Sequence, residues 1–560
     1  MAPRWQRRVP LLGLLRAYPR DLLRGDVAAG LTTAVMLIPQ AMAYASLAGM
    51  PPITGLYASL VPVVVYGLLG TSGALAFGPV AIIALLTAST VGPLSGGDPT
   101  TYVALASALA LLVGVIQLLL GFLRLGVVVD LLSHSVVSGF TSAAALVIAA
   151  SQLPELTGID TGNGQTFIAE IGALVGARDG LHLTTLLVGG TAVAGLAALK
   201  RLRTRVPGPL VVVGLLTAAA YVLDLPAAGV SILGQVPAGL PAPQLPAVGP
   251  AQLQQLVVPA LIIALLAYME GISVAKAIAA RTHERVDASQ ELIASGAANL
   301  AAGAFQAFPV AGGFSRTAVN HEAGARTPVA GLVTAATVTV ALLLFTPLFT
   351  YLPDAVLAAI VIIAVVGLVD LRTARRTWRV DRWDFSMLAV TFTATLTLGV
   401  EIGLAVGIVT SLLLLVARTA RPHIVEIGHV PGTGIYRNVH RYPTETDPGI
   451  LLVRIDAALL FATAPTVVRR VEALTATRDE RLRAVVLDAS AISDVDSDGL
   501  HTLDELERTL SVRSVGLHLA TVRGPVRDLL RSAGHWQRWQ AEGRIHETVE
   551  EALVALRAQT

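Results

Sequence analysis

The chain of 560 residues contains no cysteine and few charged or aromatic residues. The lack of cysteine excludes disulfide bonds, thiol catalysis and cysteine-ligated metals. Charged residues make up only 14%, whereas a soluble domain has roughly a quarter. The net charge of +2 argues against the broad basic surface of a nucleic-acid-binding protein. Because 54% of the residues are hydrophobic and the mean hydropathy is +0.69, the composition predicts a membrane protein.

Long apolar runs fill most of the region between residues 27 and 417. A membrane-spanning helix needs about 20 apolar residues. Candidate spans lie near 27–48, 53–70, 101–122, 126–150, 183–200, 207–224, 253–278, 327–346, 351–369, 383–400 and 401–417. Further apolar stretches, short or interrupted by glycine and proline and therefore predicted to stop partway or bend, lie near 78–92, 289–304 and 309–322. Together they predict about fourteen membrane segments.

Basic residues recur at every second connection between these segments, which is typical of cytoplasmic loops. The basic positions are Arg124; Lys200, Arg201, Arg203 and Arg205; Arg281 and Arg285; Arg326; Arg372, Arg375, Arg376, Arg379 and Arg382; and Arg418 and Arg421. This pattern predicts that both termini are cytoplasmic. Residues 1–26 form a cytoplasmic N-terminal segment, in which the apolar run Val9–Leu15 is interpreted as an interfacial helix and not as a signal peptide.

Two residue pairs repeat the same spacing along the membrane region. Gln40 precedes Pro79 by 39 residues (79 − 40), and Glu270 precedes Pro309 by the same distance (309 − 270). The two pairs are offset by 230 residues (270 − 40). Seven segments per half, an odd number, make the halves inverted, and inverted repeats with discontinuous helices are typical of secondary transporters.

Residues 421–560 have the composition and periodicity of a soluble α/β domain. Strands are predicted at Leu451–Arg454, Ala484–Leu487 and Gly516–Ala520, and helices near 463–475, 497–510, 524–533 and 545–558.

The interrupted segments Ala76–Ala81 and Phe308–Thr317 carry the chemistry that the sequence offers. In each, proline and glycine precede a short apolar helix. If both helices begin near the middle of the bilayer, their unpaired N–H groups form an anion site, to which Ser315 adds a hydroxyl group and Arg316 a positive charge. The alternative is that glycine and proline only permit close helix packing.

Several motifs resemble the sulfate permease (SulP) family, the bacterial relatives of the solute carrier 26 anion transporters. They are Ile38–Ala45, Ala48–Pro52, Gly55–Tyr57, Gly70–Ser72, Gly78–Pro79 and Phe308–Thr317. The C-terminal region resembles the STAS domain of that family, so the resemblance covers nearly the whole chain.

This resemblance implies an all-α membrane domain, residues 27–420, with inverted repeats of seven segments at about 27–224 and 253–417, followed by a cytoplasmic STAS domain, residues 421–560. It also implies a core that moves against a gate in an elevator mechanism, a homodimer, and the bacterial inner membrane as location. Carried over by motif, the residues that bind substrate are Gln40, Tyr44, Phe77, Val80, Ala81, Phe314, Ser315 and Arg316.

Glu270 is an ionisable residue within a predicted span, where such residues are usually functional. The resemblance favours a role in coupling transport to a proton or a sodium ion. The alternative is a structural ion pair with Lys276 or Arg316.

Within the STAS-like region, Asp494–Leu500 resembles the loop in which anti-sigma-factor antagonists carry a regulatory serine. Ser497 is therefore a weak candidate regulatory site, because Asp498 replaces the second serine of the usual pattern. A surface that docks a cytoplasmic protein partner is the plainer interpretation.

The sequence thus predicts a secondary transporter of a small anion of the sulfate, bicarbonate or dicarboxylate class, coupled to protons or sodium. It predicts no enzyme, metal or other cofactor, because no nucleophile with an adjacent base, metal-ligand spacing or phosphate-binding loop is recognisable. The alternatives are an uncoupled anion exchanger or channel, and a membrane anion sensor that signals through the STAS domain.

Overall fold

The computed structural model describes residues 11, 18–126, 133–159, 166–202, 207–478 and 481–558. The chain forms two compact units, Met1–Ser411 and Leu412–Thr560. The predicted segment Val9–Leu15, apart from Leu11, and the basic residues Arg203 and Arg205 lie outside the described residues.

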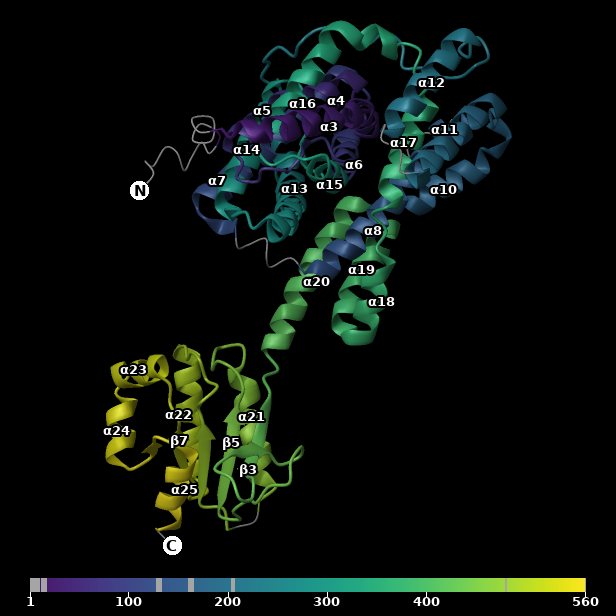
Figure 1. Cartoon of the computed structure of the whole chain (residues 1–560). Helices are drawn as coiled ribbons and strands as arrows, with labels where there is room; N and C mark the ends of the chain where they lie inside the picture. Colours follow the sequence, from purple (N-terminus) through teal and green to yellow (C-terminus); the bar gives the residue numbers. More distant parts are fainter. Residues whose placement is uncertain are drawn as a thin grey trace. The chain divides into compact units, whose positions relative to one another are not determined.

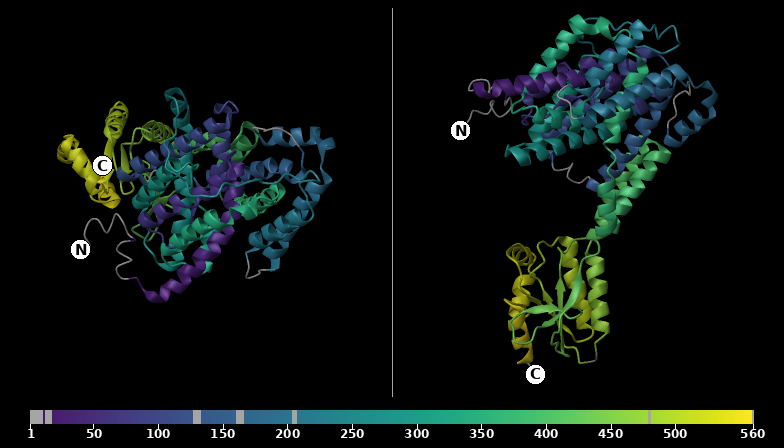
Figure 2. Two further views of the ribbon diagram at one scale, coloured as in Figure 1. Left: turned by 90° about the horizontal axis from the view of Figure 1, so that it is seen from above. Right: turned by 45° about the vertical axis from the view of Figure 1, so that its right-hand side comes forward.

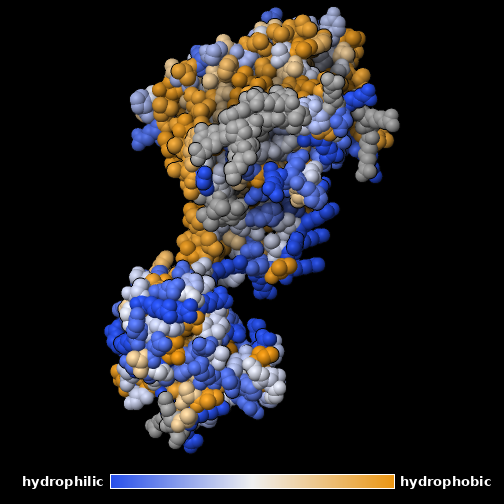
Figure 3. Space-filling view, turned by 60° about the vertical axis from the view of Figure 1, so that its left-hand side comes forward, coloured by the Kyte–Doolittle hydropathy of each residue, from blue (hydrophilic) through white to orange (hydrophobic). Residues whose placement is uncertain are grey.

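The first unit is mostly helical, which confirms the predicted fold class. Within the described ranges, nine helices are long and apolar enough to cross a membrane, and shorter apolar helices accompany them. On the face shown in Figure 3, a broad apolar region covers much of the first unit, whereas the second unit is mainly hydrophilic. The first unit is therefore the membrane unit of a multi-pass protein, and the number of about fourteen segments stays a prediction.

One group of helices, here called the core bundle, packs around α3, α7 and α14 (Figure 1). Its members are α3 (Arg20–Leu47), α4 (Pro52–Ala58), α5 (Val61–Leu69), α6 (Ala81–Val91), α7 (Pro99–Phe122), α13 (Pro250–Thr282), α14 (Ala288–Ala304), α15 (Phe314–Glu322) and α16 (Val329–Val340). Glycines allow α7 and α14 to touch along their backbones: a Cβ on Gly114 would lie 2.7 Å from the carbonyl oxygen of Gly296.

The remaining helices of the membrane unit form a second group, here called the flanking bundle, in which α8 packs on α19 and α11 on α17. Its members are α8 (His134–Ser151), α9 (Leu153–Thr157), α10 (Phe167–Gly176), α11 (Leu183–Leu202), α12 (Gly208–Val222), α17 (Asp354–Val366), α18 (Leu371–Val380), α19 (Arg382–Leu398) and α20 (Val400–Thr419). The two bundles meet where α17 and α12 touch α3 and where α6 touches α8.

Several segment boundaries differ from the sequence prediction. The span expected at 53–70 is divided into α4 and α5, and the stretch at 289–304 is one continuous helix, α14. The helices α10 and α18 were not predicted. The first is too short for a spanning window, and the second contains four arginines, so it was interpreted as a loop.

Two short strands lie within the core bundle, although only helices were expected there. Strand β1 (Phe77–Gly78) pairs antiparallel with β2 (Ala311–Gly312), with Phe77 opposite Gly312 and Gly78 opposite Ala311. The order of a long helix, a second membrane segment, a strand and a short helix therefore occurs twice, as α3 to α6 and as α13 to α15.

The second unit is an α/β domain with a six-stranded mixed sheet in the order β4-β3-β5-β6-β7-β8. The strands are β3 (Ile424–His429), β4 (Tyr436–Asn438), β5 (Ile450–Ile455), β6 (Ala484–Asp488), β7 (Gly516–Ala520) and β8 (Ile545–His546). Strands β5 to β8 are parallel, and β3 is antiparallel to both of its neighbours. The three predicted strands are confirmed, whereas β3, β4 and β8 were not predicted.

Helices cover both faces of this sheet (Figure 2). They are α21 (Ala464–Ala476), α22 (Ser497–Ser511), α23 (Gly524–Ser532), α24 (His535–Ala541) and α25 (Val549–Arg557). Leu451 and Val485 face one apolar cluster, and Leu452 and Val486 face the other, which also contains Leu553 of α25. The last helix was predicted to begin near residue 545, but strand β8 occupies that position and α25 begins at Val549.

Candidate functional site

Pairing of β1 with β2 brings two helix starts together inside the core bundle. Helix α6 begins directly after Val80, and α15 begins directly after Gly313. Neither start is capped by a side chain, so the first-turn N–H groups have no side-chain acceptor. Both interrupted segments thus end in a short helix, as predicted, and their N-terminal dipoles favour a negative charge.

The side chain of Arg316, in the first turn of α15, lies across the strand pair and is 2% exposed. Its Nη1 donates a hydrogen bond to the carbonyl oxygen of Pro79 over 2.6 Å. A Cβ on Gly313 would lie 2.9 Å from Nη2, and a Cβ on Gly78 would lie 3.7 Å from it. Glycine at 313 therefore gives the guanidinium room, whereas glycine at 78 is favoured by its φ of +146°, which side chains rarely adopt. The Nε and Nη2 atoms are buried and have no partner.

Three of the other predicted residues lie around Arg316. In α3, Gln40 Nε2 donates to the hydroxyl oxygen of Tyr44 over 2.7 Å, and both side chains are buried. Arg316 interacts electrostatically with Tyr44 and with Glu270 of α13.

Glu270 stands beside the strand pair because α13 passes close to β2. A Cβ on Gly312 would lie 2.8 Å from the Cα of Gly271. The Oε2 atom of Glu270 and the Oε1 atom of Gln40 are buried and without a partner. Glu270 interacts with the charge of Arg316, so the alternative of a structural ion pair stays open.

The remaining predicted residues contribute in different ways. Phe77 stacks on Tyr66 of α5, with ring centroids 4.6 Å apart. This contact packs β1 against α5. Val80 and Ala81 are buried at the start of α6. At the start of α15, Phe314 is 47% exposed and Ser315 is exposed.

Asn299 of α14 holds the chain just before β2, and sequence reasoning missed it. Its Oδ1 accepts from the N–H of Val310 over 2.8 Å, and its Nδ2 donates to the Val310 carbonyl oxygen over 3.1 Å. The same Nδ2 reaches Oε1 of Gln117 in α7 over 3.0 Å. Gln117 in turn donates to the carbonyl oxygen of Ala264 in α13. The available signal was an amide side chain within a short apolar segment, and the structure shows that it is completely buried.

A buried carboxylate, Glu291 of α14, fixes the chain before β1 and was also missed. Its Oε1 accepts from the N–H and hydroxyl groups of Thr71, each over 2.6 Å, and from the N–H of Ser72. Its Oε2 accepts from the Tyr66 hydroxyl group over 2.7 Å. Since Tyr66 stacks on Phe77, this carboxylate positions β1 indirectly.

In the C-terminal unit, Ser497 is the first residue of α22 and is exposed. The helix is capped by Asp496, whose carboxylate accepts from the N–H groups of Gly499 and Phe461. Ser497 thus stands at a helix start, as predicted, and its regulatory role stays a prediction.

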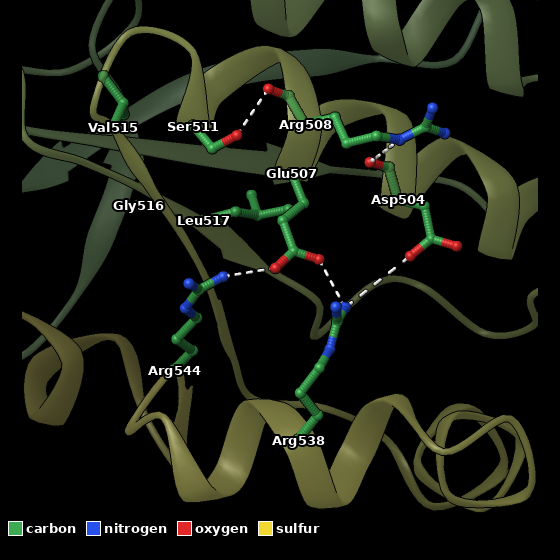
Figure 4. Close-up of a pocket in the computed structure, with 9 residues that line it drawn as sticks. All are labelled: Asp504, Glu507, Arg508, Ser511, Val515, Gly516, Leu517, Arg538 and Arg544. Atoms are coloured by element: carbon green, nitrogen blue, oxygen red, sulfur yellow. Dashed lines mark hydrogen bonds and ion pairs between the residues drawn. The ribbon is translucent and has the colours of Figure 1, made fainter.

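A cavity of about 480 Å³ in the C-terminal unit contains none of the candidate residues (Figure 4). Glu507 lies at its centre and accepts hydrogen bonds from Arg538 and Arg544, each over 2.6 Å. These charges largely neutralise one another, so we interpret the group as a structural ion network. Among the described residues, no group of three or more His, Asp or Glu is arranged to hold a metal ion.

Comparison with known proteins agrees with this architecture. Residues 23–391 match the sulfate permease family, and residues 441–552 match the STAS domain. A probable sulfate transporter of Mycobacterium tuberculosis is 38% identical over 543 residues, which cover 97% of each chain. A chloroplastic sulfate transporter of Arabidopsis thaliana is 36% identical over 97% of this chain and 82% of the relative.

The fold is also similar to a solved structure of the murine solute carrier 26 family member A9 anion transporter in the inward-facing state. The TM-score is 0.92 at 25% identity, and the match covers 98% of this chain and 94% of the other. The transmembrane domain of the cyanobacterial bicarbonate transporter BicA matches 70% of this chain and 97% of its own length, with a TM-score of 0.62 at 24% identity. The chain therefore belongs to the sulfate permease family of anion transporters and carries a C-terminal STAS domain.

Proposed function

We propose that this protein is a coupled secondary transporter of a small oxyanion of the sulfate, bicarbonate or dicarboxylate class. One observation carries the proposal. Four buried polar atoms without a partner belong to Arg316 and to residues around it: Nε and Nη2 of Arg316, Glu270 Oε2, and Oε1 of Gln40, whose Nε2 bonds to Tyr44. Unsatisfied buried groups are costly, so their presence in one place points to a ligand that satisfies them.

The free atoms of Arg316 favour an oxyanion. Nε and Nη2 lie on one edge of the planar guanidinium group, and two parallel N–H groups match two oxygens of the same anion. Since Nη1 is held by Pro79, the open edge keeps a fixed orientation. The uncapped starts of α6 and α15 add backbone donors for the remaining oxygens.

Glu270 is the proposed coupling residue. An oxyanion on Arg316 brings negative charge close to this carboxylate, and two negative charges repel each other in a buried site. A proton or a sodium ion bound at Glu270 removes that repulsion, so the anion and the cation bind together. This linkage is what coupled transport requires, because each ligand favours the state that binds the other.

The proposed movement is an elevator-type displacement of the core bundle against the flanking bundle. Both strands, both helix starts and the four unpartnered atoms named above belong to the core bundle, so the site can move as a rigid body. We further propose a homodimer in the bacterial inner membrane, with both termini and the STAS domain in the cytoplasm.

Glu270→Gln tests the coupling. The amide keeps the shape of the side chain but cannot titrate, so uptake driven by an inward pH gradient should be lost in proteoliposomes. Exchange of labelled substrate without a gradient should persist. Glu322→Gln, which removes an exposed carboxylate from α15, is the matched control and should retain both activities.

The outcomes separate the alternatives. Accumulation by Glu270→Gln equal to that of the parent would exclude Glu270 as the coupling site. A parent that responds to sodium but not to pH would identify sodium as the coupling ion. A parent that responds to neither gradient would favour the uncoupled exchanger or channel.

A further inference from the structure

Helix α18 presents a row of arginines whose side chains have no acidic partner among the described residues. It lies between α17 and α19, both in the flanking bundle, and contains Arg372, Arg375, Arg376 and Arg379. All four are exposed. In the described part of the chain, none of their guanidinium groups forms a hydrogen bond or an ion pair.

The four arginines share one side of the helix. Successive residues of an α-helix turn by about 100°, which places all four within an arc of roughly 100°. Thr373, Ala374 and Thr377 lie on the opposite side and are partly buried, which agrees with packing of α18 on α8 and α19. The basic face therefore points away from the protein.

Apolar side chains border this basic face. Leu371 and Trp378 lie along one edge of the basic face, where they are 70% and 59% exposed. Val380 lies along the other edge and is 78% exposed. Trp383, at the start of α19, is 50% exposed. A basic face bordered by exposed tryptophan and aliphatic residues is typical of helices that lie at the membrane surface.

The position of α18 is fixed at its N-terminal end. The carboxylate of Asp370 caps the helix by accepting from the N–H groups of Arg372 and Thr373. The N–H of Asp370 donates to Oγ of Ser142 in α8 over 3.0 Å. The ring of Trp378 meets Phe385 of α19 edge to face, with centroids 4.7 Å apart. The arginines are therefore held on a defined surface beside apolar helices.

We propose that the basic face of α18 binds the headgroups of anionic phospholipids. The charge is complementary, and Trp378 and Leu371 can insert beside the headgroups while the arginines contact phosphate. Short connections to α17 and α19 keep this helix next to the bilayer, so lipid is always available to it. This proposal is independent of the coupling chemistry at Glu270.

The test uses the full-length protein in bilayers of phosphatidylcholine with a small fraction of brominated lipid. Two of the five tryptophans, Trp378 and Trp383, lie at α18, and bromine quenches tryptophan fluorescence at short range. Their signal is isolated by subtracting the spectrum of a W378F/W383F variant. Brominated phosphatidylglycerol should quench this signal more than the same fraction of brominated phosphatidylcholine.

Charge variants show whether the arginines cause that preference. R375Q/R376Q/R379Q should weaken selection of phosphatidylglycerol, by roughly fivefold for each arginine at low salt. The lysine version of this triple variant should retain most of the preference. R513Q/R523Q/R527Q, which removes three exposed arginines from the C-terminal unit, is the matched control and should behave like the parent.

Four results would overturn the proposal, and the first three concern lipid. They are equal quenching by both lipids in the parent, an unchanged preference in the glutamine variant, and loss of the preference on adding inorganic phosphate, which would assign the face to a free anion. An acidic protein that binds the basic face in the absence of any lipid preference would likewise replace lipid as its partner.

Discussion

Replacement of Arg316 by alanine is the most direct test of the anion site. The structure separates two roles of this side chain, because Nη1 holds the Pro79 carbonyl oxygen whereas Nε and Nη2 are free. Loss of a charge-assisted contact to the anion costs about 1.5–3 kcal/mol. Anion affinity should therefore fall by roughly 10- to 150-fold.

The same substitution also leaves the Pro79 oxygen without its donor, which costs about 1–3 kcal/mol of folding stability. Arg316→Lys helps to separate the two effects. Lysine retains the charge, but its single ammonium group cannot bond the Pro79 oxygen and also offer two parallel N–H groups to the anion. Its anion affinity should lie between that of the parent and that of alanine.

Binding is measured by calorimetry on detergent-purified protein with sulfate, bicarbonate and dicarboxylates, after size-exclusion chromatography has shown a folded sample. Arg326→Ala is the matched control, because this arginine follows α15 and its side chain is exposed. A folded Arg316→Ala variant with unchanged affinity for every anion that the parent binds would refute the assignment.

Further predictions concern the supports of the site and the C-terminal unit. Tyr66→Phe removes a hydrogen bond to the Glu291 carboxylate and should lower thermal stability more than Tyr102→Phe, which removes one to a neutral carbonyl oxygen; equal shifts would contradict this. Burial, together with the charge of His546, lowers the pKa of His518 from 6.5 to about 4, so the unfolded chain binds a proton first, and stability should be full above pH 6.5 and fall toward pH 4. Hydrogen exchange of β7 in the full chain should therefore rise at pH 5, and it should rise less in His518→Gln. The variant His501→Gln, which replaces an exposed histidine, is the control and should behave like the parent. A flat pH response of the parent would contradict the burial argument. Truncation after Pro422 should leave anion binding intact, because every proposed site residue precedes Ser411, and complete loss of binding by a correctly inserted product would place part of the site elsewhere.

Local sequence signals were sufficient to predict where the two short helices of the interrupted segments begin. Proline and glycine before α6 and α15 predicted where these helices begin, and Arg316 was expected in the first turn, where it lies. Short runs rich in β-forming residues were sufficient for β5, β6 and β7. These features depend on neighbours in sequence, so periodicity and turn chemistry reveal them.

The supports of the site could not be predicted, because they depend on contacts between distant segments. Glu291 meets Thr71 across 220 residues, and nothing in the local pattern indicates this partner. Pairing of β1 with β2 likewise joins two-residue strands that are too short for any periodicity. Helix α18 was missed for a different reason, because its four arginines predicted a cytoplasmic connection and no helix was expected there.

The distribution of hydrogen bonds within the core bundle explains how such a site can be both rigid and open. Asn299 and Glu291 use their polar atoms to fix the backbone before each strand, so they are satisfied within the protein. Arg316 lies a few residues after β2, and Glu270 lies on the neighbouring helix α13. Both keep polar atoms without a hydrogen-bond partner. Binding free energy is lost when a site must first be ordered. Here the hydrogen bonds of Asn299 and Glu291 order the backbone of the site before the ligand binds. The unpaired atoms are therefore held in place before a ligand binds, as the proposed elevator movement would require.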